Sequence, residues 1–169
     1  DIIKKHSTVI DVCSVKKFPV DVMKKILPET VNILATHPMF GPDSAEKTLA
    51  GQKIVLCKIR IEDEKYTKTI GYLKKKELIV IEATPEKHDE EIAKTLLLTH
   101  FIGHGLINFG AKDLEIDTEG YKRLMKILDT VQNDTTQLFH DMNKYNKFSK
   151  KIRHEFIQSL NKIDGGLEK

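Results

Sequence analysis

The spacing of hydrophobic residues changes about half-way along this chain. In the first half, short apolar runs rich in β-branched side chains alternate with stretches of helical spacing. Such runs are typical of buried strands. The predicted strands are residues 8–13, 31–36, 53–59 and 77–83, and the predicted helices are residues 20–27 and 62–75. Because a strand, a helix and a strand follow in order, we expect residues 8–13 to be a fully buried strand that pairs in parallel with residues 31–36.

From Thr84 onward no run predicts a strand. Residues 84–86 (Thr-Pro-Glu) form a helix start, with a hydroxyl cap, proline at the first helical position and an acid in the first turn. We expect one helix from there to Gly110, whose glycine is a suitable stop. The predicted inner face of this helix consists of Ile92, Leu96, His100, Gly103 and Ile107.

The last part of the chain repeats apolar residues in steps of three and four. Asp117-Thr118 predicts a helix cap, and Asn133-Asp134 predicts a break in the helix that follows. A second apolar stripe runs from Phe148 to Ile163, just before Gly165-Gly166. Such spacing is typical of helices that pack on other helices. The residues of the first stripe are Tyr121, Leu124, Leu128, Val131, Thr135, Leu138 and Met142.

These patterns predict an α/β fold followed by an all-α fold. We place the α/β part at residues 1–83 and the helical part at residues 84–169, with no Ser/Gly/Pro-rich linker between them. A chain of 169 residues can bury an ordinary hydrophobic core without disulfides or metals.

The composition fits a globular protein and excludes several classes. A net charge of +3 is too small to indicate nucleic-acid binding, and the Lys74–Lys76 run fits a solvated helix end. We expect Cys13 and Cys57 to be buried thiols in a reducing compartment. No apolar run is long enough to cross a bilayer, and no signal peptide is present, so we expect a cytoplasmic protein.

The most chemically suggestive stretch is residues 37–44 (H-P-M-F-G-P-D-S). His37 follows the predicted strand 31–36, and Ser14 follows the predicted strand 8–13, so both would lie at the ligand-binding edge of a parallel sheet. A histidine with an ordinary pKa of about 6.5 can act as a general base near neutral pH. The alternative is a histidine that only caps a strand end through a hydrogen bond.

Other histidines lie in the helical part. His100 and His104 are one turn apart, but no HExxH motif and no further ligand cluster accompany them, so we predict no metal site. Asp89, beside His88, fits a carboxylate that stabilises a helix amino end. In a continuous helix Asp89 and His100, eleven residues apart, would face the same way.

Several common catalytic motifs are missing from these 169 residues. The GxSxG turn of hydrolases and the phosphate-binding P-loop do not occur. Gly103 and Gly105 begin a GxGxxG spacing, but position 108 is Asn.

The chain resembles the prephenate/arogenate dehydrogenase family, and the plant-type arogenate branch most of all. The resemblance covers essentially the whole sequence. It rests on residues 11–16 (D-V-C-S-V-K), residues 36–44 (T-H-P-M-F-G-P-D-S), His88-Asp89 with Thr99-His100, and residues 117–121 (D-T-E-G-Y) with residues 143–146 (N-K-Y-N).

The resemblance implies an oxidoreductase of tyrosine biosynthesis that performs an NAD(P)-dependent oxidative decarboxylation. By motif match, His37 would accept the proton of the ring hydroxyl, and Ser14 would hydrogen-bond that hydroxyl and orient His37. The other implied substrate-binding residues are His100, Asp43, Ser44, His104 and Lys16, and the implied cofactor-binding residues are Ser14, Pro38 and Met39. The plant-type resemblance favours NADP over NAD.

Two of these expectations concern the substrate. The carboxylate of Asp43 would pair with the amino group of arogenate, which prephenate lacks. Plant-type relatives carry Arg where His104 stands, so His104, Arg123 or Lys126 would take over binding of the substrate carboxylate.

The resemblance also implies a partial Rossmann-type sheet packed on a helical domain that forms a homodimer. Family members have a Gly-rich half before the strand that residues 8–13 match, so we expect this chain to be a carboxyl-terminal portion that is inactive by itself. The alternative, from another functional class, is a non-catalytic helical dimerisation or interaction module with a remnant sheet.

Overall fold

The computed structural model describes residues 3–41, 45–46, 48–132 and 134–168. The chain forms two compact units, Asp1–Asp89 and Glu90–Lys169, and each is described by itself. The predicted boundary after residue 83 lies shortly before this division, which therefore assigns His88 and Asp89 to the first unit. None of the helices in the described ranges has the length and apolar character of a bilayer span.

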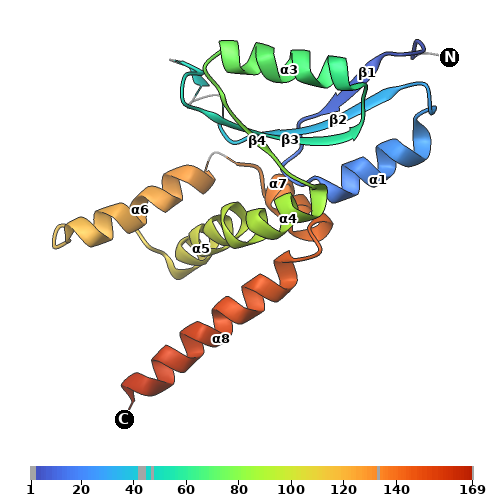
Figure 1. The fold of residues 1–169 in the computed structure, drawn as a ribbon. Helices are drawn as coiled ribbons and strands as arrows, with labels where there is room; N and C mark the ends of the chain where they lie inside the picture. Colours follow the sequence, from blue (N-terminus) through green and yellow to red (C-terminus); the bar gives the residue numbers. More distant parts are fainter. Residues whose placement is uncertain (1–2, 42–44, 47, 133, 169) are drawn as a thin grey trace. The chain divides into compact units, whose positions relative to one another are not determined.

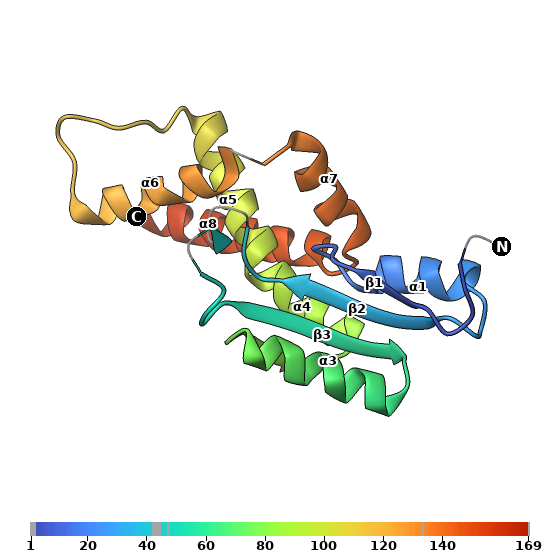
Figure 2. The same cartoon turned by 90° about the horizontal axis from the view of Figure 1, so that it is seen from above.

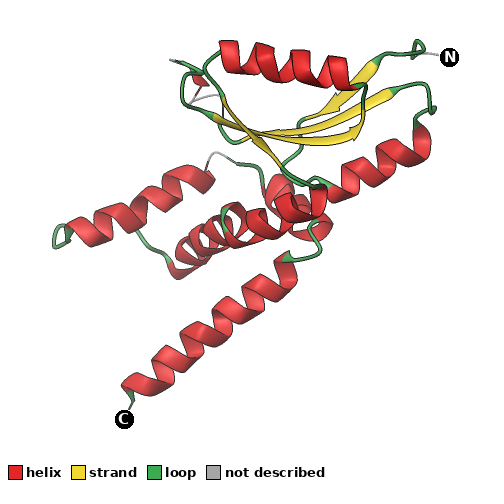
Figure 3. Cartoon of the chain, viewed as in Figure 1, coloured by secondary structure: helices red, strands yellow, loops and turns green. Residues whose placement is uncertain are grey.

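The first unit is built on a mixed sheet of four strands, and the hydrophobic runs predict these four strands but not the antiparallel pair among them (Figure 3). The strand order is β1-β2-β3-β4; β1 and β2 are parallel, β2 and β3 antiparallel, and β3 and β4 parallel. The predicted parallel pairing of the first two strands is therefore confirmed. The strands are β1 (Thr8–Asp11), β2 (Asn32–Pro38), β3 (Lys53–Arg60) and β4 (Ile79–Glu82).

Two helices cover opposite faces of this sheet, as Figures 1 and 2 show: α1 (Lys17–Ile26) and α3 (Asp63–Lys75). Because neighbouring residues of a strand point to opposite faces, Ile33 packs with Met23 of α1. Leu34, the next residue of β2, packs with Tyr66 of α3. The side chains of Ile33 and Leu34 are both fully buried, so β2 lies at the centre of the core.

The prediction that the first strand is fully buried is wrong. Ile10 is 52% exposed and Val12 is 65% exposed. The reason is that β1 is an end strand, which in the described sheet pairs with β2 alone. Cys13, directly after Val12, is exposed rather than buried, whereas Cys57 on β3 is the buried free thiol that the sequence predicts.

The predicted helix start after β4 is confirmed. The backbone N–H of Lys87 donates to the hydroxyl of Thr84 at 3.2 Å, and α4 spans Pro85–Lys94. The prediction of one continuous helix is wrong, because Thr95 has non-helical angles (φ −116°, ψ −90°) and a second helix, α5 (Leu96–Phe109), follows. The Thr95 hydroxyl donates to the Glu91 carbonyl at 2.8 Å. Such back-bonding by threonine often bends helices.

The break at Thr95 also removes the basis for placing Asp89 and His100 on one helix face. That prediction assumed a straight helix through both residues, and the two residues lie on α4 and α5. The predicted stop is confirmed, because Gly110 ends α5 in the left-handed conformation (φ 79°) that favours glycine.

The second unit is helical, as predicted, with α5 packed on each of the other three helices that the structure describes after it. The caps at Thr118 and Thr135 accept the backbone N–H groups of Tyr121 and Leu138 at 3.2 and 3.1 Å. The predicted interruption near Asn133-Asp134 is confirmed, because one helix ends at Gln132 and the next begins at Thr136. These helices are α6 (Glu119–Gln132), α7 (Thr136–Tyr145) and α8 (Ser149–Leu167).

Candidate functional site

His37 lies near the carboxyl end of β2, one residue before its last residue, Pro38. The alternation of the strand places His37 on the same face as Ile33 and Ala35, which α1 covers. Only 5% of the residue is exposed. The predicted placement of His37 near the carboxyl end of a strand that pairs in parallel with the first strand is therefore confirmed.

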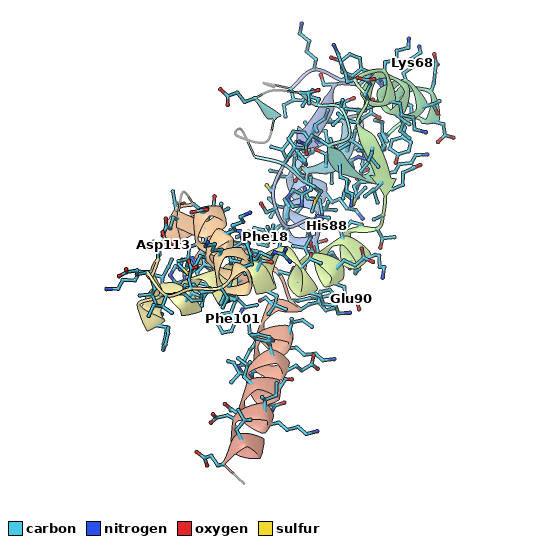
Figure 4. The ribbon with its side chains drawn as sticks, turned by 90° about the vertical axis from the view of Figure 1, so that its left-hand side faces the viewer. Phe18, Lys68, His88, Glu90, Phe101 and Asp113 are labelled. Carbon is cyan, nitrogen blue, oxygen red and sulfur yellow. The ribbon has the colours of Figure 1, made fainter. Side chains whose placement is uncertain are left out.

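A second buried histidine contacts His37. The Nδ1 atom of His37 lies 2.9 Å from the Nε2 atom of His88, and the two rings meet edge to face with centroids 5.1 Å apart. His88 is 4% exposed and comes from the first turns of α4 (Figure 4). The Nε2 atom of His37 makes no hydrogen bond within the described part of the chain. Nε2 is therefore the ring nitrogen of His37 without a hydrogen-bond partner among the described residues.

Asp89 continues the chain of contacts. The Nδ1 atom of His88 lies 2.9 Å from Oδ1 of Asp89. The same carboxylate accepts the backbone N–H groups of Lys16 at 2.7 Å and Lys17 at 2.9 Å. These groups belong to the amino end of α1, which has no side-chain cap of its own and no acid in its first turn. Asp89 therefore stabilises a helix amino end, as its type predicts, but that of α1.

Lys16 holds the strand ends together. It is fully buried, and its Nζ atom donates to the Asp11 carboxylate and to the Thr36 carbonyl. The Thr36 hydroxyl donates to the Asp11 carbonyl at 2.7 Å. The resemblance implies that Lys16 binds substrate, and that role stays a prediction. In the structure its ammonium group anchors the backbone directly before His37.

The surroundings of His37 lower its pKa to about 3. Burial is the largest cause, and the neighbouring His88 and Lys16 act in the same direction, whereas Asp89 opposes them. The ring is therefore neutral at physiological pH, with a lone pair available to accept a proton. The same burial makes the ring a weak base unless something stabilises its protonated form.

The structure shows fewer contacts for the other residues predicted for this part of the site. Ser14, half-buried, lies between β1 and α1, but the hydrogen bond described for His37 is made to His88 and not to Ser14. Met39 is 37% exposed, and its N–H donates to the Lys53 carbonyl at 2.9 Å. Pro38 closes β2 opposite Ile54. Asp43 and Ser44 lie outside the described residues. The roles predicted for Ser14, Pro38 and Met39 stay predictions.

The two predicted histidines of the second unit lie on α5. His100 is 2% exposed, and its Nε2 atom lies 3.5 Å from Oδ2 of Asp134. Its Nδ1 atom is buried without a hydrogen-bond partner among the described residues. Burial is the main cause that lowers the pKa of His100. His104 stacks on Phe139 with ring centroids 4.0 Å apart.

The structure thus brings together His37, Lys16 and the pair His88-Asp89 in the first unit. The sequence pointed to Asp89 as a residue that stabilises a helix amino end and to His88-Asp89 as part of a resemblance, but it linked neither residue to His37. The signal that could have found it is a histidine directly followed by an acid in the first turns of a helix that comes after a sheet edge. Its partners lie 51 and 73 positions away, so no local pattern could name them.

Comparison with known families identifies the family of this chain. Residues 1–97 match the family described as prephenate dehydrogenase, nucleotide-binding domain. The chain belongs to the prephenate/arogenate dehydrogenase family. Residues 106–169 match a second family description, TYRAAT1-like, C-terminal domain.

Curated relatives of this chain include plant enzymes. It is 33% identical to arogenate dehydrogenase 2, chloroplastic, of Arabidopsis thaliana over 149 residues, which are 85% of the chain and 42% of that relative. It is 30% identical to arogenate dehydrogenase 1, chloroplastic, of the same plant, over 85% of the chain and 23% of the relative. The chain spans less than half the length of either relative. The predicted similarity to the plant-type branch is confirmed.

A solved relative confirms the predicted fold class. Prephenate dehydrogenase from A. aeolicus, in complex with hydroxyphenyl propionate and NAD+, superposes with a TM-score of 0.68 at 24% identity. The match covers 94% of this chain and 58% of that one. At this identity the comparison shows the fold, a Rossmann-like mixed sheet with several helices.

Proposed function

We propose that this chain carries the proton-accepting part of an arogenate or prephenate dehydrogenase, an oxidoreductase of tyrosine biosynthesis. The observation that carries the proposal is the environment of His37. Its ring is buried at the carboxyl end of β2, Nδ1 is held by His88 at 2.9 Å, and Nε2 is left for a ligand. A non-catalytic module does not require two buried histidines in contact at the end of a strand.

In the proposed reaction, Nε2 of His37 accepts the proton of the substrate's ring hydroxyl. The carbon that bears this hydroxyl gives up a hydride, and the resulting ketone loses carbon dioxide as the ring becomes aromatic. NAD or NADP, when bound, supplies the acceptor for the hydride. The protein's own residues orient and receive the proton.

The residues present do not by themselves form a complete dinucleotide site. Residues 1–97 match a nucleotide-binding domain, but the 169 residues contain no G-x-G-x-x-G run that would cradle a pyrophosphate. We therefore assign no phosphate contact within this chain. Ser14, Pro38 and Met39 remain candidates for the nicotinamide side, and NADP is favoured over NAD by the similarity to plant-type relatives.

Substrate choice and assembly follow from the same proposal. Arogenate rather than prephenate would be selected if the Asp43 carboxylate pairs with an amino group of the substrate. The second unit would form a homodimer through α8, whose exposed apolar residues support an interface. These residues, with their exposed fractions, are Ile157 (39%), Leu160 (48%), Ile163 (60%) and Leu167 (82%). The protein would act in the cytoplasm.

The test joins a Gly-rich dinucleotide-binding half from a relative to residue 1 and measures reduction of NAD and NADP with arogenate and with prephenate. We expect turnover by the fusion and none by the 169-residue chain alone. His37→Asn should lower kcat by about 10²-fold or more, as loss of a general base does. His154→Gln, an exposed histidine on α8, is the control and should leave kcat unchanged.

Separate measurements decide the finer parts of the proposal. If the fusion binds the dinucleotide but turns over neither substrate, the proposed activity is wrong. If Asp43→Asn leaves the ratio of arogenate to prephenate turnover unchanged, the assigned role of Asp43 is wrong. Light scattering measures the molar mass of the wild type, expected to be a dimer, and of Ile163→Glu, expected to be a monomer; equal masses would contradict the proposed interface on α8.

A further inference from the structure

We propose that His88 and Asp89 are positioning residues that set the tautomer of His37 and so leave its Nε2 atom as the proton acceptor. This inference rests on the proposed role of His37 and extends it to two residues that were given no part in the reaction. The geometry that carries it is a continuous buried chain: His37 to His88 at 2.9 Å, and His88 to Asp89 at 2.9 Å.

The chain starts at a carboxylate whose orientation is fixed. Both oxygens of Asp89 accept backbone N–H groups of the first residues of α1, one from Lys16 and one from Lys17. An ionised carboxylate only accepts hydrogen bonds. The nitrogen of His88 that faces Oδ1 of Asp89 must therefore carry the hydrogen, so neutral His88 is the Nδ1–H tautomer, and its Nε2 atom is an acceptor.

The same reasoning applies to His37. Because Nε2 of His88 is an acceptor, the nitrogen of His37 that faces it must be a donor. Neutral His37 is then also the Nδ1–H tautomer, and the lone pair lies on Nε2. If His88 had the opposite tautomer, His37 would present an N–H at Nε2 and could not accept a proton there. Asp89 thus decides, through His88, whether His37 is a base toward a ligand.

The chain also compensates for the burial that weakens His37 as a base. When His37 gains a proton at Nε2, its Nδ1–H becomes a charge-assisted donor to His88. Burial, the largest cause, lowers the pKa of His37, and His88 and Lys16 act in the same direction, whereas Asp89 raises it. The ammonium of Lys16 is itself paired with Asp11, which limits its effect. Asp89 is the group that favours the protonated ring.

A merely structural reading makes a different prediction. On that reading Asp89 only caps α1 and His88 only fills the core, so any residue that caps and packs equally well would serve. Asn is as good a helix cap as Asp. Here, however, Oδ1 of Asp89 both accepts the Lys16 N–H and faces Nδ1 of His88, and Oδ2 accepts the Lys17 N–H, so the amide of Asp89→Asn cannot replace the carboxylate. Variants of His88 separate the two readings, because Phe and Gln both fill the core but only Gln offers an acceptor to Nδ1 of His37.

The experiment is long-range 1H–15N NMR of the 169-residue chain labelled with 15N-histidine, which reports the tautomer of each ring at neutral pH. In the wild type we expect the Nδ1–H form for both His37 and His88. His88→Phe should release His37 to a tautomer mixture, and His88→Gln, which offers a carbonyl acceptor, should restore part of the Nδ1–H form.

His154→Gln is the control and should leave the His37 signals in place. A wild-type His37 in the Nε2–H form would overturn the inference, and so would an unchanged His37 tautomer in a folded His88→Phe chain. Backbone amide spectra of each variant show whether it has folded. If one variant fails to fold, the wild-type tautomers and the remaining variants still decide the question.

Kinetics of the active fusion give an independent readout. His88→Phe and Asp89→Asn should lower kcat by about tenfold or more, with KM changed much less, and the acidic limb of the kcat profile should move. His88→Gln should recover part of kcat. If the wild-type fusion has no activity but the predicted tautomers are observed, the proposed function is wrong, whereas the inference that Asp89 and His88 set the tautomer of His37 is supported. A normal kcat in a folded His88→Phe fusion would contradict the positioning role of His88.

Discussion

Asp89 of α4 accepts the backbone N–H of Lys16 at 2.7 Å, across 73 positions of the sequence. Lys16 in turn donates from its side chain to Asp11 and to the carbonyl of Thr36, the residue before His37. One lysine therefore connects the ends of β1 and β2 to the acid that faces His88. This relationship makes the geometry around His37 depend on residues from four separate elements of the first unit.

The Asp89 carboxylate should be a large contributor to stability. Asp89→Ala leaves two N–H groups at the amino end of α1 without their buried acceptor, which we expect to lower the free energy of unfolding by about 1–3 kcal/mol. Urea unfolding followed by circular dichroism measures this. Asp21→Ala removes an exposed acid of α1 that pairs with Lys17, and should change stability by about 0.5 kcal/mol or less. Equal effects of the two substitutions would contradict the assigned role of Asp89.

Stability should fall as the solution is acidified, partly because of His37. Its pKa is about 3 in the folded protein and near 6.5 when unfolded, so between these values the unfolded chain binds a proton that the folded one does not. This single group gives a slope of up to about 1.4 kcal/mol per pH unit, with stability lost as pH decreases. Urea unfolding across this window should show a shallower slope for His37→Gln. The same slope in both proteins would count against the buried, neutral ring.

The buried ion pair of Lys16 and Asp11 gives a third prediction. Lys16→Met leaves the Asp11 carboxylate without its cation in a site where one oxygen already lacks a partner among the described residues. We expect a loss of about 3–5 kcal/mol. The double variant Lys16→Met/Asp11→Leu should be more stable than Lys16→Met alone, because the unpaired charge is gone. A double variant less stable than either single variant would show that the charge is not the main cost.

The packing of α5 on α6 gives a fourth prediction. A Cβ atom at Gly103 would lie 2.7 and 2.9 Å from the two methyl groups of Val131, closer than side chains tolerate. We expect Gly103→Ala to destabilise the second unit by about 1–3 kcal/mol. Gly105→Ala is a matched control on the same helix, where nothing lies within 4 Å, and should be neutral or stabilising by up to about 1 kcal/mol. Thermal unfolding of both variants tests the difference, and a destabilised Gly105→Ala with an unaffected Gly103→Ala would refute the close approach.

Much of the local structure could be predicted because its causes are local. Hydrophobic runs indicated the strands, the cap at Thr84 indicated the start of α4, and Gly110 indicated the end of α5. The break at Thr95 could not be predicted from periodicity, because apolar residues continue at helical spacing on both sides of it. The exposure of Ile10 also escaped, since an apolar run looks the same in an edge strand and in a central one.

By itself, the sequence determined which strands and helices follow one another along the chain, apart from the break at Thr95. It also determined the family and the placement of His37 at the carboxyl end of a strand. These features depend on short-range periodicity, on caps and on contiguous motifs. Only the tertiary structure decided what His37 contacts. His88 and Asp89 reach His37 and the amino end of α1 because the chain returns along the sheet before α4 begins. Hydrogen bonds between residues 51 and 73 positions apart depend on how the elements pack, and no local pattern specifies them.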